Sequence, residues 1–301
     1  MITDVEGIRV GHWTHSGGLT GCTVVLPPEG TVASCEWRGG APGDREWVLL
    51  QPEQRVDRIH GLVLSGGSAF GLATADGVMR WCESNGIGWD VAGVVKVPIV
   101  PAAILFDLRL GGSTGRPDAE SGRAACEAAT DGEFEVGSVG AGAGCTAGKL
   151  QGIEWAVKSG IGSFSMAEDG VIVAALVAAN PVGDVLDEIG MVLAGSRAPV
   201  GTPAARFSER ENTVLGVVAT NAVLTKQEAH LLAKAGQDGV SAVVRPAHTR
   251  YDGDVVFGLS TRQVKAPVDL VLAMAPKVIA GAIRNAVMAA KGAPGFPGLA
   301  D

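Results

Sequence analysis

The sequence has few of the features that mark proteins which bind nucleic acid or enter the secretory pathway. Basic residues are in the minority, with 24 Lys and Arg against 32 Asp and Glu, and no basic stripe or aromatic-rich basic patch occurs. Because binding to nucleic acid depends on basic side chains that neutralise phosphates, we expect no nucleic-acid partner. The N-terminus, MITDVEGIRVG, is acidic where a signal peptide would be basic, and it lacks the apolar core of one.

Cysteine pairs at disulfide or zinc-site spacing are also missing. The chain has an odd number of cysteines and no C-x-x-C pair, which fits reduced thiols in the cytosol. The scattered cysteines are Cys22, Cys35, Cys82, Cys126 and Cys145. We therefore predict a cytoplasmic protein without a structural zinc site.

An uninterrupted apolar run of bilayer length is absent too. The most apolar stretch, 268–290, contains Asp269, Pro276, Lys277 and Arg284. Since a bilayer-spanning helix rarely tolerates so many interruptions, we expect a buried core helix and no membrane partner.

What the chain does have is glycine and a high apolar content. Glycine accounts for 44 of 301 residues, about twice its average usage, and 47% of residues are hydrophobic. Short apolar segments alternate with small-residue helical segments, without repeats or linkers, so the residues predict a layered α/β fold over a single domain, 1–301. The expected strands are 23–26, 59–64, 170–179, 214–219, 241–245 and 254–259, an extended segment near a sheet edge is expected over 97–108, and helices are expected at 69–84, 227–234 and in the final apolar stretch.

Several motifs approach a known pattern and then depart from it. Ser68 lies in GGSAFG, which resembles a G-x-S-x-G nucleophile turn, but Phe70 occupies the place of the second glycine. The segment GCTAGKL has Ala143 and Leu150 at two fixed positions of a phosphate-binding loop. The histidines show no metal-ligand spacing. We therefore predict no cofactor and no metal, and a packing turn at Ser68.

One remaining feature is Thr213. It directly follows a polar loop at 208–212 and stands at the start of an apolar strand. A threonine hydroxyl is a poor nucleophile unless a base takes its proton, and an N-terminal threonine can use its own α-amine as that base. Cleavage between Asn212 and Thr213 would create such an amine. From spacing alone, a threonine that merely begins a strand is the commoner interpretation.

The chain resembles the P1 peptidases, family S58, which include L-aminopeptidase/D-esterase, β-peptidyl aminopeptidases and nylon-oligomer hydrolase. The resemblance is collinear from Gly7 to the end of the chain. It is carried by GLTGCTVVLPPEG, RGGAPGDRE, LVLSGGSAFGLATADGVMRW, VPIVPAAILFDL, GAGCTAGK, ENTVLGVVATNAVLTK and RPAHTRYDGDVVFGLST.

This resemblance implies a four-layer α-β-β-α sandwich, a homo-oligomer that is often a tetramer, and a precursor that cuts itself. The cut would separate a large subunit, 1–212, from a small subunit, 213–301. Thr213 would become the nucleophile, with Lys149, Asn180, Asp252 and Asp254 around it. On chemical grounds, Asn180 would donate to the oxyanion, Lys149 would lower the pKa of the amine, and the two aspartates would offset the lysine charge.

The substrate expected from this resemblance is a small linear amide or peptide. Aminopeptidase members have Gly-Ser at the cut, whereas this chain has Asn-Thr, as nylon-oligomer hydrolase does. A general amidase therefore fits at least as well as an aminopeptidase. Two alternatives remain open, an acyltransferase of the ornithine acetyltransferase type and a non-catalytic small-molecule binding protein.

Overall fold

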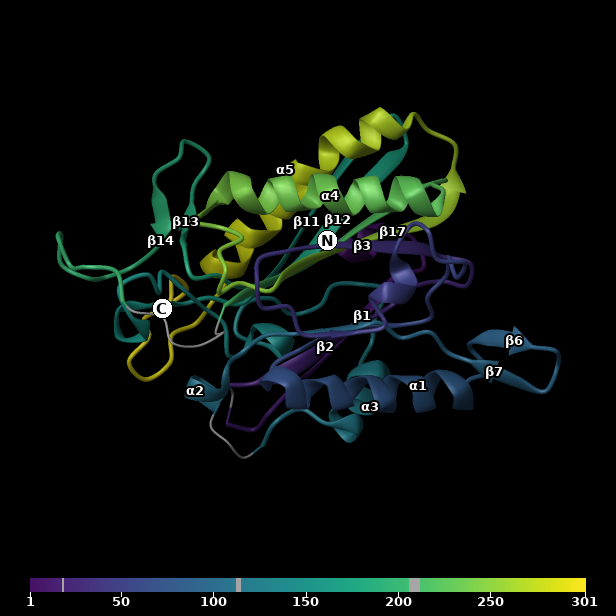
Figure 1. Cartoon of the computed structure of the whole chain (residues 1–301), viewed down its shortest axis with the longest axis horizontal. Helices are drawn as coiled ribbons and strands as arrows, with labels where there is room; N and C mark the ends of the chain where they lie inside the picture. Colours follow the sequence, from purple (N-terminus) through teal and green to yellow (C-terminus); the bar gives the residue numbers. More distant parts are fainter. Residues whose placement is uncertain (18, 112–114, 206–211) are drawn as a thin grey trace.

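Two five-stranded sheets face each other between two pairs of helices in the computed structural model, which describes residues 1–17, 19–111, 115–205 and 212–301. Figure 1 shows α4 and α5 above one sheet and α1 and α3 below the other. The four-layer α-β-β-α sandwich implied by the resemblance is therefore confirmed.

The first sheet has the strand order β1-β2-β5-β8-β4, and α1 and α3 pack on its outer face. Its neighbouring strands are antiparallel except β5 and β8. Its elements are β1 (Arg9–Thr14), β2 (Gly21–Leu26), β4 (Asp44–Arg45), β5 (Leu62–Ser65), β8 (Ala102–Ile104), α1 (Thr74–Ser84) and α3 (Ala119–Glu127). Because β8 is next to the two-residue edge strand β4, the Pro-rich segment 97–108 lies near the sheet edge, as its two prolines predict.

The second sheet has the strand order β11-β12-β15-β17-β3, and α4 and α5 cover its outer face. Strands β15 and β17 are parallel, and the other neighbours are antiparallel. Its elements are β3 (Val32–Arg38), β11 (Ile161–Glu168), β12 (Val171–Asn180), β15 (Thr213–Ala222), β17 (Asp254–Val264), α4 (Lys226–Val243) and α5 (Val268–Met288). A layer covered on both faces needs apolar residues on both, and every residue of β15 is buried.

The main core lies between the two sheets, where Leu64 from the first meets Leu176 and Phe257 from the second. Two further apolar layers lie under the helix pairs. Helix α5 is long and apolar enough to cross a membrane by length and composition. It packs on α4 and on β11 and β12, as expected for a buried core helix.

Two of the expected elements were wrong at the end of α4. We predicted a helix over 227–234 and a strand over 241–245, but the helix runs to Val243 and only Val244–Arg245 (β16) is extended. Gly236 and Gly239 explain the longer helix. A Cβ on Gly239 would lie 2.5 Å from the Pro276 carbonyl oxygen, so this glycine allows α4 and α5 to approach closely.

The remaining elements are short. They comprise an exposed hairpin that extends from the body (Figure 1), small strands around the two sheets, and single helical turns. Their bounds are β6 (Trp89–Val91), β7 (Val95–Val97), β9 (Thr146–Ala147), β10 (Val157–Lys158), β13 (Asp184–Leu186), β14 (Val192–Ala194), α2 (Leu108–Gly111) and the 3-10 helices Ile2–Asp4, Val48–Leu50, Ser68–Ala73, Gly140–Gly142 and Ile153–Trp155.

Candidate active site

The ends of three neighbouring strands bring the predicted site residues together. Strand β12 ends at Asn180, which is directly opposite Thr213 at the start of β15. Strand β17 runs parallel to β15 on its other side and begins at Asp254. Because all three strand termini lie at the same end of the second sheet, side chains that are distant in sequence lie close together.

The peptide bond between Asn212 and Thr213 is held from two directions. The Thr213 hydroxyl donates a hydrogen bond to the Asn212 carbonyl oxygen, and the backbone N–H of Gly253 donates to the same oxygen over 3.1 Å. Thr213 is 5% exposed, and Asn212 pairs with Asp252 in an isolated parallel bridge. The preceding polar residues 209–211 lie outside the described residues. This carbonyl is therefore polarised by a backbone donor that the sequence did not reveal.

Lys149 and Asn180 form a buried polar pair beside that bond. Lys149 Nζ donates to Asn180 Oδ1 over 2.8 Å and to the Asn180 carbonyl oxygen over 3.0 Å. The backbone N–H of Thr146 also donates to Asn180 Oδ1, over 3.0 Å, and Asn180 Nδ2 donates to the Phe106 carbonyl oxygen over 3.1 Å. The Thr146 hydroxyl donates to the same oxygen over 3.4 Å, so these hydrogen bonds fix the orientation of the amide.

The two aspartates accept hydrogen bonds from different groups. Asp254 Oδ1 accepts from the backbone N–H of Val214 over 2.7 Å, and Oδ2 lies 2.7 Å from His248 Nδ1. Asp252 Oδ2 accepts from the N–H and the hydroxyl of Thr249 over 2.7 and 2.6 Å. Asp254 thus anchors the residue after Thr213, and it is supported by His248, for which the sequence indicated no role.

Charge on Asp252 is disfavoured in this setting. Burial, followed by the nearby Asp254 carboxylate, raises the pKa of Asp252 from 3.8 to about 6, while hydrogen bonds from Thr249 and the positive charge of Lys149 act in the opposite direction. The electrostatic effect of Lys149 on Asp252 is consistent with the predicted role of the aspartate in offsetting the lysine charge.

A third buried carboxylate lies next to the network and was missed from the sequence. Asp107 follows Phe106, its Oδ1 accepts from the Gly67 N–H over 2.7 Å, and burial raises its pKa to about 6. A Cβ on Gly66 would lie 2.0 Å from Asp107 Oδ2, so close packing accounts for glycine in the turn before Ser68. This geometry favours the packing interpretation of the GGSAFG segment.

The described residues contain no cluster of three or more His, Cys, Asp or Glu side chains suited to hold a metal ion. The GCTAGK segment has a different use from a phosphate loop. Thr146 presents its backbone N–H to Asn180, and Lys149 presents its ammonium to the same side chain. The five predicted site residues therefore lie together, and their roles remain predictions.

Comparisons with known proteins identify the family of the chain. The model of peptidase family S58 matches residues 1–300. A Mycobacterium leprae protein named as an uncharacterized aminopeptidase is 40% identical, over 98% of this chain and 92% of its own. A 6-aminohexanoate-oligomer endohydrolase of Paenarthrobacter ureafaciens is 28% identical, over 88% of this chain and 76% of its own.

Solved structures show the same fold at lower identity. A Burkholderia sp. beta-aminopeptidase superposes with a TM-score of 0.75 at 22% identity, covering 96% of this chain and 86% of that one. The L-aminopeptidase D-Ala-esterase/amidase from Ochrobactrum anthropi, described as a variant of the Ntn hydrolase fold, has a TM-score of 0.76 at 21% identity, covering 98% and 88%. These similarities place the sandwich among the Ntn-hydrolase folds.

Proposed function

Since the chain belongs to peptidase family S58, we propose that it is a self-processing amidohydrolase whose nucleophile is Thr213. The single observation that carries the proposal is the contact of the Thr213 hydroxyl with the carbonyl of Asn212, on an oxygen that also accepts the Gly253 N–H. A hydroxyl next to a polarised carbonyl is the arrangement that an intramolecular acyl shift requires.

Maturation would begin with attack of Thr213 Oγ on the carbonyl carbon of Asn212. The C–N bond then breaks as the C–O bond remains, the hydroxyl proton passes to the leaving nitrogen, and an ester joins Asn212 to Thr213 Oγ. Water hydrolyses the ester, giving a carboxylate on Asn212 and a free α-amine and hydroxyl on Thr213. In the first step, negative charge develops on the oxygen that accepts from Gly253, so this N–H would stabilise the oxyanion.

Turnover would use the same hydroxyl with a new base. The α-amine of Thr213, with an ordinary pKa of about 7.7–8.0, takes the hydroxyl proton as Oγ attacks the substrate amide, and returns it to the leaving amine. Lys149 would lower the pKa of this amine by charge repulsion. Asp254 holds the Val214 N–H next to the amine, and Asp252 offsets the lysine charge.

Asn180 would be the oxyanion donor for the substrate. Its amide oxygen is held by Lys149 and Thr146, which fixes the orientation of the NH₂ group. One hydrogen of that group bonds to the Phe106 carbonyl oxygen, and the second would be donated to the oxyanion. Removal of one such donor costs about 10²–10³ in kcat in comparable sites.

The substrate we propose is a small linear amide or peptide. The relatives named above are an aminopeptidase and an endohydrolase, and both activities hydrolyse an amide bond. Hydrolysis is therefore favoured over the acyltransferase and binding-protein alternatives, and no observation in the site favours either of these.

Substitution of the nucleophile tests the proposal. Thr213→Ala should run as one unprocessed chain without amidase activity, and Thr213→Ser, which keeps a hydroxyl, should process at least partly. Thr220→Ala is a matched control, because Thr220 lies on the same strand and its hydroxyl donates to the Ile172 carbonyl oxygen and accepts from the Ala222 N–H, away from Asn212. Denaturing gels would score processing. Full processing of Thr213→Ala would remove Thr213 from the mechanism.

A further inference from the structure

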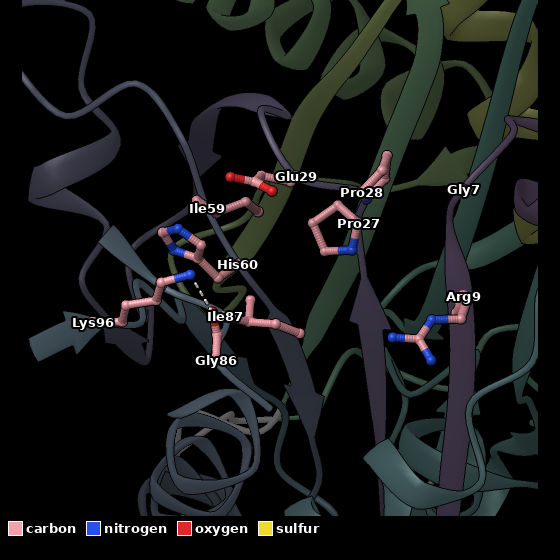
Figure 2. Close-up of a pocket in the computed structure, with 11 residues that line it drawn as sticks. Gly7, Arg9, Pro27, Pro28, Glu29, Ile59, His60, Gly86, Ile87 and Lys96 are labelled. Atoms are coloured by element: carbon pink, nitrogen blue, oxygen red, sulfur yellow. Dashed lines mark hydrogen bonds between the residues drawn. The ribbon is translucent and has the colours of Figure 1, made fainter. Parts of the chain in front are cut away.

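A pocket lies at the other end of the first sheet from Thr213. Phe106, which accepts from Asn180, follows the C-terminal end of β8, and Gly66 follows β5 at the same end. Ile59 and His60, in contrast, precede β5 and line this pocket, together with Arg9 at the start of β1. The pocket, drawn in Figure 2, has a volume of about 230 Å³.

Arg9 supplies a half-buried positive charge to this pocket. Its guanidinium carbon lies 5.7 Å from the centroid of the Trp81 ring. Among the residues that the structure describes, no carboxylate or carbonyl oxygen accepts a hydrogen bond from the Arg9 guanidinium, and none forms an ion pair with it. Figure 2 shows the guanidinium extending toward Ile87 across the pocket. The guanidinium therefore lies near an aromatic ring but has no anionic partner among these residues. A planar carboxylate matches the geometry of its N–H donors.

His60 and Lys96 add donors from the opposite wall. The His60 Nδ1 accepts from the Ile99 N–H over 3.0 Å, so in this hydrogen-bond assignment the ring hydrogen is on Nε2. Burial lowers the pKa of His60, which keeps the ring neutral and Nε2 a donor. Lys96 Nζ donates to the Gly86 carbonyl oxygen over 2.6 Å, and an ammonium has two more hydrogens to donate (Figure 2).

The charges and the apolar side chains that line the pocket indicate which kind of ligand it fits. Arg9 and Lys96 are positive, and the exposed Glu29 is the one acidic residue of the lining, which leaves a net charge of +1 on a protein of net charge −8. This balance matches a monoanion. The other walls include apolar side chains, among them Ile59 and Ile87. At roughly 30 Å³ for a water molecule, the volume suits a ligand of about eight non-hydrogen atoms.

We infer that this pocket, at the end of the first sheet remote from Thr213, is a binding site for a small monocarboxylate with a short apolar chain. Arg9 binds the carboxylate, Lys96 and His60 Nε2 lie around it as further donors, and Ile59 and Ile87 contact the chain. The site is separate from the hydrolytic centre, and its occupancy does not depend on processing of the chain.

Calorimetric titration with sodium hexanoate tests the inference. The purified protein should bind one hexanoate with a Kd of about 1 mM or tighter. Arg9→Met, which keeps an unbranched side chain and removes the charge, should weaken binding about tenfold or more, and Lys96→Met should also weaken it. Arg123→Met is the matched control, because Arg123 lies on α3 and pairs with Glu127. This variant should bind hexanoate with the affinity of the unmodified protein.

Parallel titrations separate this site from others. Thr213→Ala should bind hexanoate as the unmodified protein does, hexylamine should not bind, and inorganic phosphate should bind more weakly than hexanoate. The inference is wrong if hexanoate does not saturate the protein, if Thr213→Ala loses binding that Arg9→Met retains, or if phosphate is preferred. If thermal melts show that Arg9→Met does not fold, Lys96→Met decides, and an unchanged affinity in that variant overturns the site.

Discussion

The two parts of the Asn180 side chain give substitutions that separate its structural role from its chemical role. Asn180→Ala removes the acceptor for Lys149 Nζ and for the Thr146 N–H, and it removes the donor to the Phe106 carbonyl. Asn180→Asp keeps an oxygen in the acceptor position and replaces only the NH₂ group. Both variants lose the NH₂ group, which is the proposed oxyanion donor and the donor to the Phe106 carbonyl, but only Asn180→Ala also removes the acceptor for Lys149 Nζ and the Thr146 N–H.

The expected magnitudes differ accordingly. A buried donor left without an acceptor costs about 1–3 kcal/mol, so Asn180→Ala should be destabilised by about this much through the Thr146 N–H, while Lys149 Nζ keeps its hydrogen bond to the Asn180 carbonyl oxygen. Asn180→Asp can pair its carboxylate with Lys149, so its stability should stay closer to that of the unmodified protein. In both variants, loss of the donor should lower kcat by about 10²–10³.

Amide hydrolysis, normalised to the amount of processed small subunit, is the assay for turnover, and urea denaturation measures stability. The expected pattern is a loss of kcat in both variants with a loss of stability mainly in Asn180→Ala. If either variant turns over at nearly the unmodified rate, Asn180 is not the oxyanion donor. If Asn180→Asp is as unstable as Asn180→Ala, the amide oxygen does not have the structural role assigned to it.

Three further perturbations test the surroundings of Thr213. Gly253→Ala should slow processing by about 10²-fold, because the new Cβ would lie 2.3 Å from the Ala41 carbonyl oxygen and displace the N–H that donates to Asn212. Gly132→Ala, at an uncrowded position, should process normally. Equal processing rates in the two variants would refute the role of the Gly253 N–H. In the unprocessed Thr213→Ala protein, Asp252→Asn should raise the free energy of unfolding by up to about 3 kcal/mol at pH 8 and by little at pH 4. The reason is that the pKa of Asp252 is about 6 in the folded protein and 3.8 in the unfolded chain, so stability falls as pH rises between these values. An equal effect at both pH values in urea denaturation would contradict this assignment. Overnight dialysis against a chelator should leave amidase activity unchanged, and activity that is lost and then restored by zinc would contradict a metal-free mechanism.

The strand ends around the site could be predicted from sequence because local signals mark them. Asn180-Pro181 ends an apolar run, and Thr213 begins one, so both boundaries were close to the observed β12 and β15. The sequence Thr225-x-x-Glu228 is a local signal of the same kind for the start of α4, and the structure shows the two reciprocal hydrogen bonds of a capping box, Thr225 N–H to Glu228 over 2.7 Å and Glu228 N–H to Thr225 over 3.2 Å.

What the sequence could not provide depends on contacts between distant segments. The backbone N–H of Gly253 and the carboxylate of Asp107 belong to ordinary turn residues until the chain folds. The β-branched residues at the end of α4 favour a strand locally, but packing on α5 through Gly239 keeps them helical. The two-sheet architecture itself came from the resemblance, because strands buried on both faces, such as β15, lack the alternation that assigns a face.

The measurement that tests the central claim most directly is denaturing mass spectrometry of the purified protein, followed by N-terminal sequencing of the small fragment. Self-processing at Asn212-Thr213 predicts two polypeptides, 1–212 and 213–301, and a small fragment that begins Thr-Val-Leu-Gly. A different first residue would assign the nucleophile elsewhere. A single intact chain with full amidase activity would contradict the N-terminal threonine mechanism altogether.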